Sequence, residues 1–271
     1  MSETLTLVVR ADATIDKAFS ALTDRAALTQ WLSEFADVEL PNRYRFWGRF
    51  IPDGDEPRQT LSSATDRSIR FRWDLDNTAT DVSIALEPLD ALATSIQVTQ
   101  SGFDPASEGP LGQLQTFWAL ALANLVDLLE EREVTPRADL TSNELSAEVM
   151  IAAPVDAVFE SLVSSEKVSA WFGAPLEIEP REGGRFGYGR IVEFAPERRM
   201  SVDFAGMGTV TWELEGSGGR TRLTISQSGF DPDRPPYAAW MGVLSGIAEL
   251  RRFHELPDWR PLWPFEEASP S

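Results

Sequence analysis

Residues 14–22 read TIDKAFSAL, and residues 154–162 read PVDAVFESL. The two stretches match at a constant offset of 140, which also relates Trp31 to Trp171. In each stretch the apolar residues recur at positions i, i+3, i+4 and i+7, the spacing of one helix face. Both stretches therefore predict an amphipathic helix, and their likeness indicates that the chain contains one unit twice.

Two further markers repeat in the same order. Residues 99–105 read TQSGFDP and residues 226–232 read SQSGFDP at an offset of 127, so the second copy is 13 residues shorter between the markers. Trp118 and Trp240 follow at an offset of 122, each within a long apolar run. Markers that repeat once, at so long a spacing, are typical of a duplicated domain and not of a solenoid.

We expect four parts along the chain. Residues 1–132 form the first domain, and residues 147–254 form the second. Residues 133–146 are polar, contain a proline and lack periodicity, so we expect a linker there. Residues 255–271 form a tail rich in proline and tryptophan, and its aromatic side chains predict that it straps over one domain.

The same order of elements is predicted in both copies. A short strand, at residues 5–10 or 148–151, precedes the amphipathic helix. A second short helix then begins after Asp24 or Ser164, both good N-caps, and ends at the tryptophan. The middle of each copy alternates apolar and polar residues with the period of a strand, and a long apolar helix closes the copy. Strands grouped between helices indicate an α+β fold, with a curved antiparallel sheet wrapped around the last helix.

The composition excludes several classes of protein. The formal net charge is -19, cysteine is absent, and His254 is the one histidine. A disulfide framework, a thiolate nucleophile and a cysteine-ligated metal are therefore excluded, and we expect no catalytic residue, metal or cofactor. Neither half has a basic face, so we expect no nucleic-acid partner. No stretch has the length of a membrane span or the pattern of a signal peptide, so we expect a cytoplasmic protein that does not insert into membranes.

Six side chains are predicted to face the interior. Gln100 continues the face of Ile96 and Val98, and Gln227 occupies the matching position of the second copy. Each amide is either bonded within the protein near its turn or a polar anchor in a ligand cavity. The tryptophans are either core or the aromatic wall of such a cavity. We take as candidate cavity-lining residues Trp73, Gln100, Trp118, Trp212, Gln227 and Trp240.

The second copy contains four short motifs, namely Ala153-Pro154, Trp171-Phe172-Gly173, TWELE at residues 211–215, and Ser228-Gly229-Phe230. This pattern resembles the SRPBCC (START-like, helix-grip) superfamily, and within it the branch named after the C-terminal domain of the activator of the 90-kDa heat-shock-protein ATPase. The resemblance implies two tandem helix-grip domains. It also implies an apolar cavity between each sheet and its last helix, which members use for lipids, hormones or polyketides. Relatives often carry a histidine where this chain has Gln100 and Gln227.

Three functions are compatible with these features. We expect a non-enzymatic binding protein for a small hydrophobic molecule, because the aromatic interior comes without acid-base groups. The first alternative is an enzyme that resembles aromatase/cyclases and acts on a polyketide-type substrate, with Tyr44, Tyr188 and the two glutamines as its participants. The second is a chaperone-associated protein-binding module. We do not expect stimulation of the heat-shock-protein ATPase, since the activator's N-terminal domain has no counterpart in this sequence.

Overall fold

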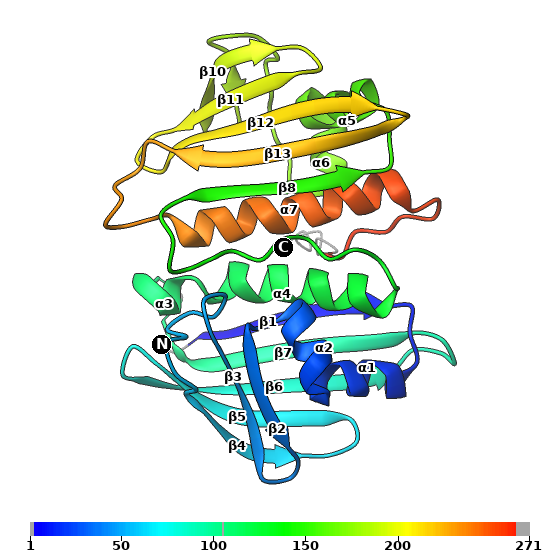
Figure 1. Cartoon of the computed structure of the whole chain (residues 1–271), viewed down its shortest axis with the longest axis vertical. Coiled ribbons are helices and arrows are strands. Elements are labelled where there is room, and N and C mark those ends of the chain that lie inside the picture. Colours follow the sequence, from blue (N-terminus) through cyan, green and yellow to red (C-terminus); the bar gives the residue numbers. More distant parts are fainter. Residues whose placement is uncertain (1–2, 105, 264–271) are drawn as a thin grey trace, which may run out of the picture. The chain divides into compact units, whose positions relative to one another are not determined.

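The computed structural model describes residues 3–104 and 106–263. The chain divides into two compact units, Met1–Thr141 and Ser142–Ser271, and each unit has its own antiparallel sheet (Figure 1). The helices among the described residues are all too short or too polar to cross a membrane.

The described part of the first unit has a five-stranded sheet in the order β1-β7-β6-β5-β4 and a separate hairpin of β2 and β3. Two short helices, α1 and α2, follow the first strand, and α3 and α4 follow the last strand. The bounds are β1 Glu3–Ala11, α1 Ile15–Thr23, α2 Arg25–Trp31, β2 Phe35–Glu39, β3 Arg43–Trp47, β4 Gln59–Ala64, β5 Ser68–Leu75, β6 Thr78–Pro88, β7 Thr94–Phe103, α3 Gly109–Gly112 and α4 Leu114–Leu129.

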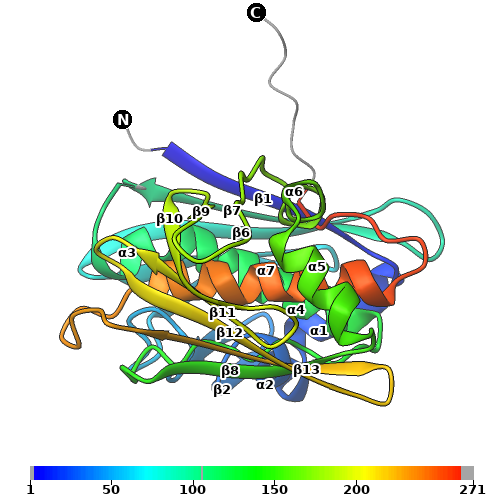
Figure 2. The same cartoon turned by 90° about the horizontal axis from the view of Figure 1, so that it is seen from above.

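The described part of the second unit repeats this order with a six-stranded sheet, β8-β13-β12-β11-β10-β9. Helices α5 and α6 follow its first strand, and α7 is the last helix, in contact with α6 (Figure 2). The bounds are β8 Leu145–Ile151, α5 Val155–Val163, α6 Ser165–Phe172, β9 Arg185–Phe186, β10 Gly189–Ala195, β11 Arg199–Phe204, β12 Gly208–Ser217, β13 Arg220–Ser228 and α7 Tyr237–Glu255.

Helices α1, α2 and α6 each begin at a residue whose side chain caps the helix. The hydroxyl of Thr14 accepts a hydrogen bond from the backbone N–H of Lys17, and the side chains of Asp24 and Ser164 cap α2 and α6 in the same way. The tryptophan at the end of each short helix donates from its indole to a backbone carbonyl of the preceding helix, at 3.0 Å from Trp31 and 2.7 Å from Trp171. In both copies, therefore, the same indole-to-carbonyl hydrogen bond joins the two short helices.

Strand alternation builds the inner face of each sheet. In β5, Ile69, Phe71 and Trp73 are buried while the arginines between them are exposed. Helix α4 runs beside β1 and buries most of its residues, and α7 lies beside β8 (Figure 1). Each sheet with its last helix is thus the α+β arrangement expected from the sequence.

Part of the segment expected to be a linker, residues 133–146, is hydrogen-bonded to the first unit, and its last two residues begin β8. The backbone N–H and carbonyl of Thr135 pair with the side chain of Asn124, both at 2.9 Å. Arg137 donates to the carbonyl of Ser33 at 2.7 Å, and its guanidinium lies 4.1 Å from the ring centroid of Phe50. These bonds join side chains to distant backbone groups, so polar composition and missing periodicity gave no sign of them.

The described part of the tail lies against α7. Trp259 donates from its indole to Glu249 at 3.2 Å, and the backbone N–H of Leu262 donates to the same carboxylate. The ring of Trp259 also meets Phe253 edge to face, with centroids 5.1 Å apart. The rest of the predicted strap, with the prolines and the aromatic ring beyond residue 263, lies outside the described residues.

Candidate functional site

Both polar atoms of the Gln100 side chain, in the first unit, are hydrogen-bonded within the protein. Trp118 Nε1 donates to Gln100 Oε1 at 2.7 Å, and Gln100 Nε2 donates to Thr80 Oγ1 at 2.9 Å. Thr80 Oγ1 in turn donates to the carbonyl of Trp73 at 2.8 Å. All four residues are 0% exposed. The chain of bonds ties α4 to β7, β6 and β5 and leaves Gln100 without a free atom for a ligand.

Aromatic rings close the interior of the first unit around this chain. Tyr44 and Phe46 of the β2–β3 hairpin cover β5, with ring centroids 5.4 Å apart for Tyr44 and Phe71 and 5.3 Å apart for Phe46 and Trp73. Trp118 meets Trp73 edge to face at 6.0 Å. All of these rings are at most 1% exposed. Burial raises the pKa of the Tyr44 phenol far above its ordinary value, so the phenol is neutral and not a base.

The second unit has the same strand register with one decisive change. Gln227 pairs with Val210 as Gln100 pairs with Val82. Two residues before Val82 stands Thr80, whereas two residues before Val210 stands Gly208. Since glycine has no hydroxyl, Gln227 Nε2 donates to the carbonyl of Met207 at 2.8 Å instead. Gln227 Oε1 is buried and has no donor among the described residues.

Steric contacts keep this position a glycine. Gly208 has a φ of +85°, in the left-handed region that side chains rarely adopt. A Cβ added to it would lie 2.2 Å from the carbonyl oxygen of Ser228. A threonine therefore does not fit at Gly208, and the bond that satisfies Gln100 cannot form in the second unit.

An aromatic wall leads from the surface of the second unit toward its interior. Tyr188 is 79% exposed, and its ring lies 5.2 Å from that of Phe204, which is half-buried. Phe186, also half-buried, lies 6.4 Å from Phe204 and 5.7 Å from Trp212. Trp212 is 6% exposed and sits on the inner face of β12. We call Tyr188, Phe204, Phe186 and Trp212 the aromatic wall.

The shorter second copy has fewer strands to cover this region than the first copy. Phe204 pairs with Gly208 as Trp73 pairs with Thr80, so Phe204 holds the register position of Trp73. In the first unit the β2–β3 hairpin covers that position. The described residues between α6 and β10 supply only the two-residue strand β9. Sequence reasoning missed Phe186 and Phe204, although the shortening by 13 residues was the signal that pointed to this region.

The surface beside the outer end of the aromatic wall is hollowed. A depression of about 560 Å³ is bordered by Tyr188, by a run of glycines, and by the charged side chains of Glu179, Arg185 and Arg190. Phe172, at the end of α6, is 47% exposed. Trp240 is buried in α7, where Gly242, Val243 and Gly246 are only half-buried.

The six candidate residues therefore fall into two groups. Trp73, Gln100 and Trp118 contact one another and form a filled core. In the second unit Gln227 and Trp212 share the inner face of neighbouring strands β13 and β12, and Trp240 is buried on α7. All six face inward as predicted, while their contact with a ligand stays a prediction.

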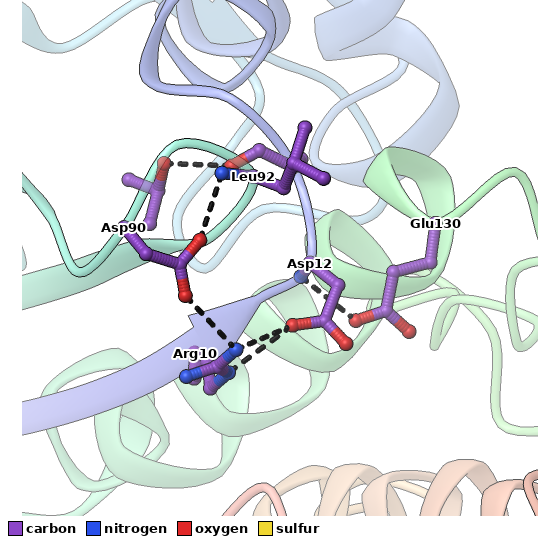
Figure 3. A network of polar contacts seen from close by, with 7 residues as sticks. Arg10, Asp12, Asp90, Leu92 and Glu130 are labelled. Carbon is purple, nitrogen blue, oxygen red and sulfur yellow. Dashed lines mark hydrogen bonds and ion pairs between the residues drawn. The ribbon is translucent and has the colours of Figure 1, made fainter.

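Several acidic residues gather at exposed ends of elements, whereas Asp127 and Glu249 are buried. Arg10 pairs with Asp12 at 3.0 Å and with Asp90 at 3.8 Å, and Glu130 accepts from the backbone N–H of Asp12 at 3.2 Å (Figure 3). Asp90 also accepts from the backbone N–H of Leu92. Exposed pairs of this kind hold loops and contribute little energy. Within residues 3–104 and 106–263, no group of three or more acidic or histidine side chains could hold a metal ion.

Each unit is a helix-grip domain, an antiparallel sheet closed by a long C-terminal helix with two short helices after the first strand, and the chain is a tandem pair of them. The sequence matches the family described as Activator of Hsp90 ATPase homolog 1-like protein over residues 12–130 and again over residues 152–250. The chain belongs to this family.

Solved structures of similar fold include both tandem and single-domain proteins. DynU16, a protein in the dynemicin biosynthetic locus, is 17% identical, with 93% of this chain and 98% of that chain covered and a TM-score of 0.42. The di-domain ARO/CYC BexL, from the BE-7585A biosynthetic pathway, is 16% identical over 96% and 100% of the two chains, with a TM-score of 0.35. The Aha1 dimer from Colwellia psychrerythraea is 18% identical over 47% and 96%, with a TM-score of 0.41. These values establish no shared function, and no curated protein matches the sequence.

Proposed function

We propose that this protein binds a small hydrophobic molecule in its second unit, between the sheet and α7, without acting on it chemically. The observation that carries the proposal is the contrast between the two interiors. The rings of the first unit are sealed, whereas the aromatic wall of the second unit runs from exposed Tyr188 to buried Trp212.

The exposed rings of the second unit favour an apolar occupant. Tyr188 and Phe172 expose large apolar surface to water, and covering such surface stabilises a complex by about 25 cal/mol for each Å² removed from water. Ligand sites are typically walled by aromatic side chains with a few polar groups that orient the ligand. The aromatic wall and the free oxygen of Gln227 have this composition.

The geometry gives less support to the cyclase alternative. Tyr44 is sealed in the first unit, away from solvent, and Tyr188 lies at the surface with its side chain 79% exposed. The two tyrosines and the two glutamines are therefore divided between separate sites. No observation among the described residues favours the chaperone-associated alternative over ligand binding.

A dye titration tests the proposal. The neutral dye N-phenyl-1-naphthylamine is added to the full chain, and its fluorescence is measured for the natural protein and for Tyr188→Ser. Losing the ring that opens the wall should weaken the binding of the dye about fivefold, equivalent to about 1 kcal/mol.

The matched control is Phe35→Ser, which removes a ring that is 46% exposed in the first unit. It should leave the affinity for the dye unchanged. The proposal is wrong if the dye does not bind, or if Phe35→Ser weakens binding as much as Tyr188→Ser does.

A further inference from the structure

The free oxygen of Gln227 limits which molecules the second unit can accept. The Met207 carbonyl is a pure acceptor, so the amide atom that faces it at 2.8 Å must be the NH₂ group. This contact fixes the orientation of the amide and leaves Oε1, an acceptor, as the unpaired atom. Gln227 is 4% exposed, and its cross-strand neighbours Val210 and Leu145 are buried and apolar.

We propose that the ligand of the second unit is a hydroxylated aromatic molecule whose hydroxyl donates a hydrogen bond to Gln227 Oε1. This inference rests on the proposed function, because it concerns the same site. A buried acceptor without a donor is costly, so a ligand that brings a donor is favoured over one that does not. A carboxylate is disfavoured, since it would set a negative oxygen against the amide oxygen.

The planar part of the ligand follows from the aromatic wall. Trp212 lies diagonally across from Gln227 on the inner face of β12 and β13, a spacing that one bicyclic ring system can bridge. The rings of Phe186 and Trp212 contact each other, with centroids 5.7 Å apart and planes inclined by 35°. In the proposed complex, a planar ligand extends this pair by offset stacking. The hydroxyl of that ligand would then point along the diagonal from Trp212 to Gln227.

In the first unit, both polar atoms of the matching amide, Gln100, have hydrogen-bond partners. There the indole of Trp118 donates to Gln100 Oε1, and the hydroxyl of Thr80 accepts from Gln100 Nε2. Both partners are missing around Gln227, the second because Gly208 has no side chain. A hydroxylated ring in the second unit would take the role that Trp118 has in the first, as an aromatic group with a single donor.

Two probes of the same shape separate the hydroxyl from the ring. 2-Naphthol and 2-methoxynaphthalene are each used to displace N-phenyl-1-naphthylamine from the full chain. We expect 2-naphthol to bind about tenfold more tightly than its methyl ether, because the ether leaves Gln227 Oε1 unpaired. In Gln227→Leu this preference should fall to less than about twofold while the ether still binds, and Gln100→Leu should keep the full preference.

Each outcome decides one claim. Equal binding of the two probes by the natural protein, or a preference that survives in Gln227→Leu, overturns the hydroxyl proposal and leaves the proposed function standing. If neither probe displaces the dye, the hydroxyl proposal is overturned as well. If the dye itself does not bind, the proposed function fails. The comparison of probes on the natural protein needs no variant, so the test holds even if Gln227→Leu does not fold.

Discussion

Replacing the two inward glutamines separately should reveal that they have different roles. Gln100→Leu removes the acceptor of the Trp118 indole and a donor to Thr80. Because Trp118 is fully buried, its N–H would be left without a partner, which costs about 1–3 kcal/mol, and the branched side chain adds some packing strain. We therefore expect Gln100→Leu to lower the unfolding free energy of the first unit by about 2–3 kcal/mol.

Gln227→Leu is the matched change in the second unit. It removes one bond, to the half-buried Met207, but it also removes a buried oxygen that has no donor. The two effects oppose each other, so the free energy of unfolding should change by less than about 1 kcal/mol.

Hydrogen exchange measured by mass spectrometry reports on each unit separately, through the slowest amides of β7 and β13. It also avoids treating a two-domain chain as a single unfolding transition. The reasoning is refuted if the two variants lose equal stability in their own units, or if Gln227→Leu loses more.

Three further changes test other parts of the account. Gly208→Ala should cost about 2 kcal/mol more than Gly206→Ala. Both glycines have a positive φ, but only at Gly208 would the added Cβ lie 2.2 Å from a carbonyl oxygen. Thermal unfolding of the two variants makes the comparison, and equal losses would contradict it. Thr80→Val should destabilise the first unit by about 1–2 kcal/mol in urea, since it removes both the acceptor of Gln100 and the donor to Trp73, and an unchanged midpoint would argue against the network. Burial, and then the charge of Lys167, lower the pKa of His254, so the unfolded chain binds the proton more readily and stability falls with falling pH. His254→Gln should therefore lose less stability than the natural protein between about pH 7.5 and about pH 5.5. Parallel losses of stability in the two proteins would contradict this.

Local patterns in the sequence predicted local structure well. The spacing of Ile15, Ala18, Phe19 and Leu22 predicted α1, and the caps Asp24 and Ser164 marked where the next helices begin. The inward direction of Gln100 and Gln227 followed from strand alternation alone.

Which hydrogen bonds these glutamines make could not be predicted in the same way. The partner of Gln100 depends on the register between β6 and β7, which sets Thr80 within reach, and register is a contact between distant residues. The same holds for Gly208 and for the cover that Tyr44 and Phe46 give to the first interior. For the same reason, the sequence predicted equivalent sites in the two copies, whereas the structure pairs both polar atoms of the Gln100 side chain and leaves Gln227 Oε1 without a donor.

Fluorine NMR of the full chain labelled with 5-fluorotryptophan tests most directly whether the second unit alone takes a ligand. Each tryptophan gives its own resonance, and single Trp→Phe variants assign Trp73, Trp118 and Trp212. On addition of 2-naphthol, the account predicts that the resonance of Trp212 shifts while those of Trp73 and Trp118 stay in place. A shift of Trp73 or Trp118 with Trp212 unchanged would contradict it.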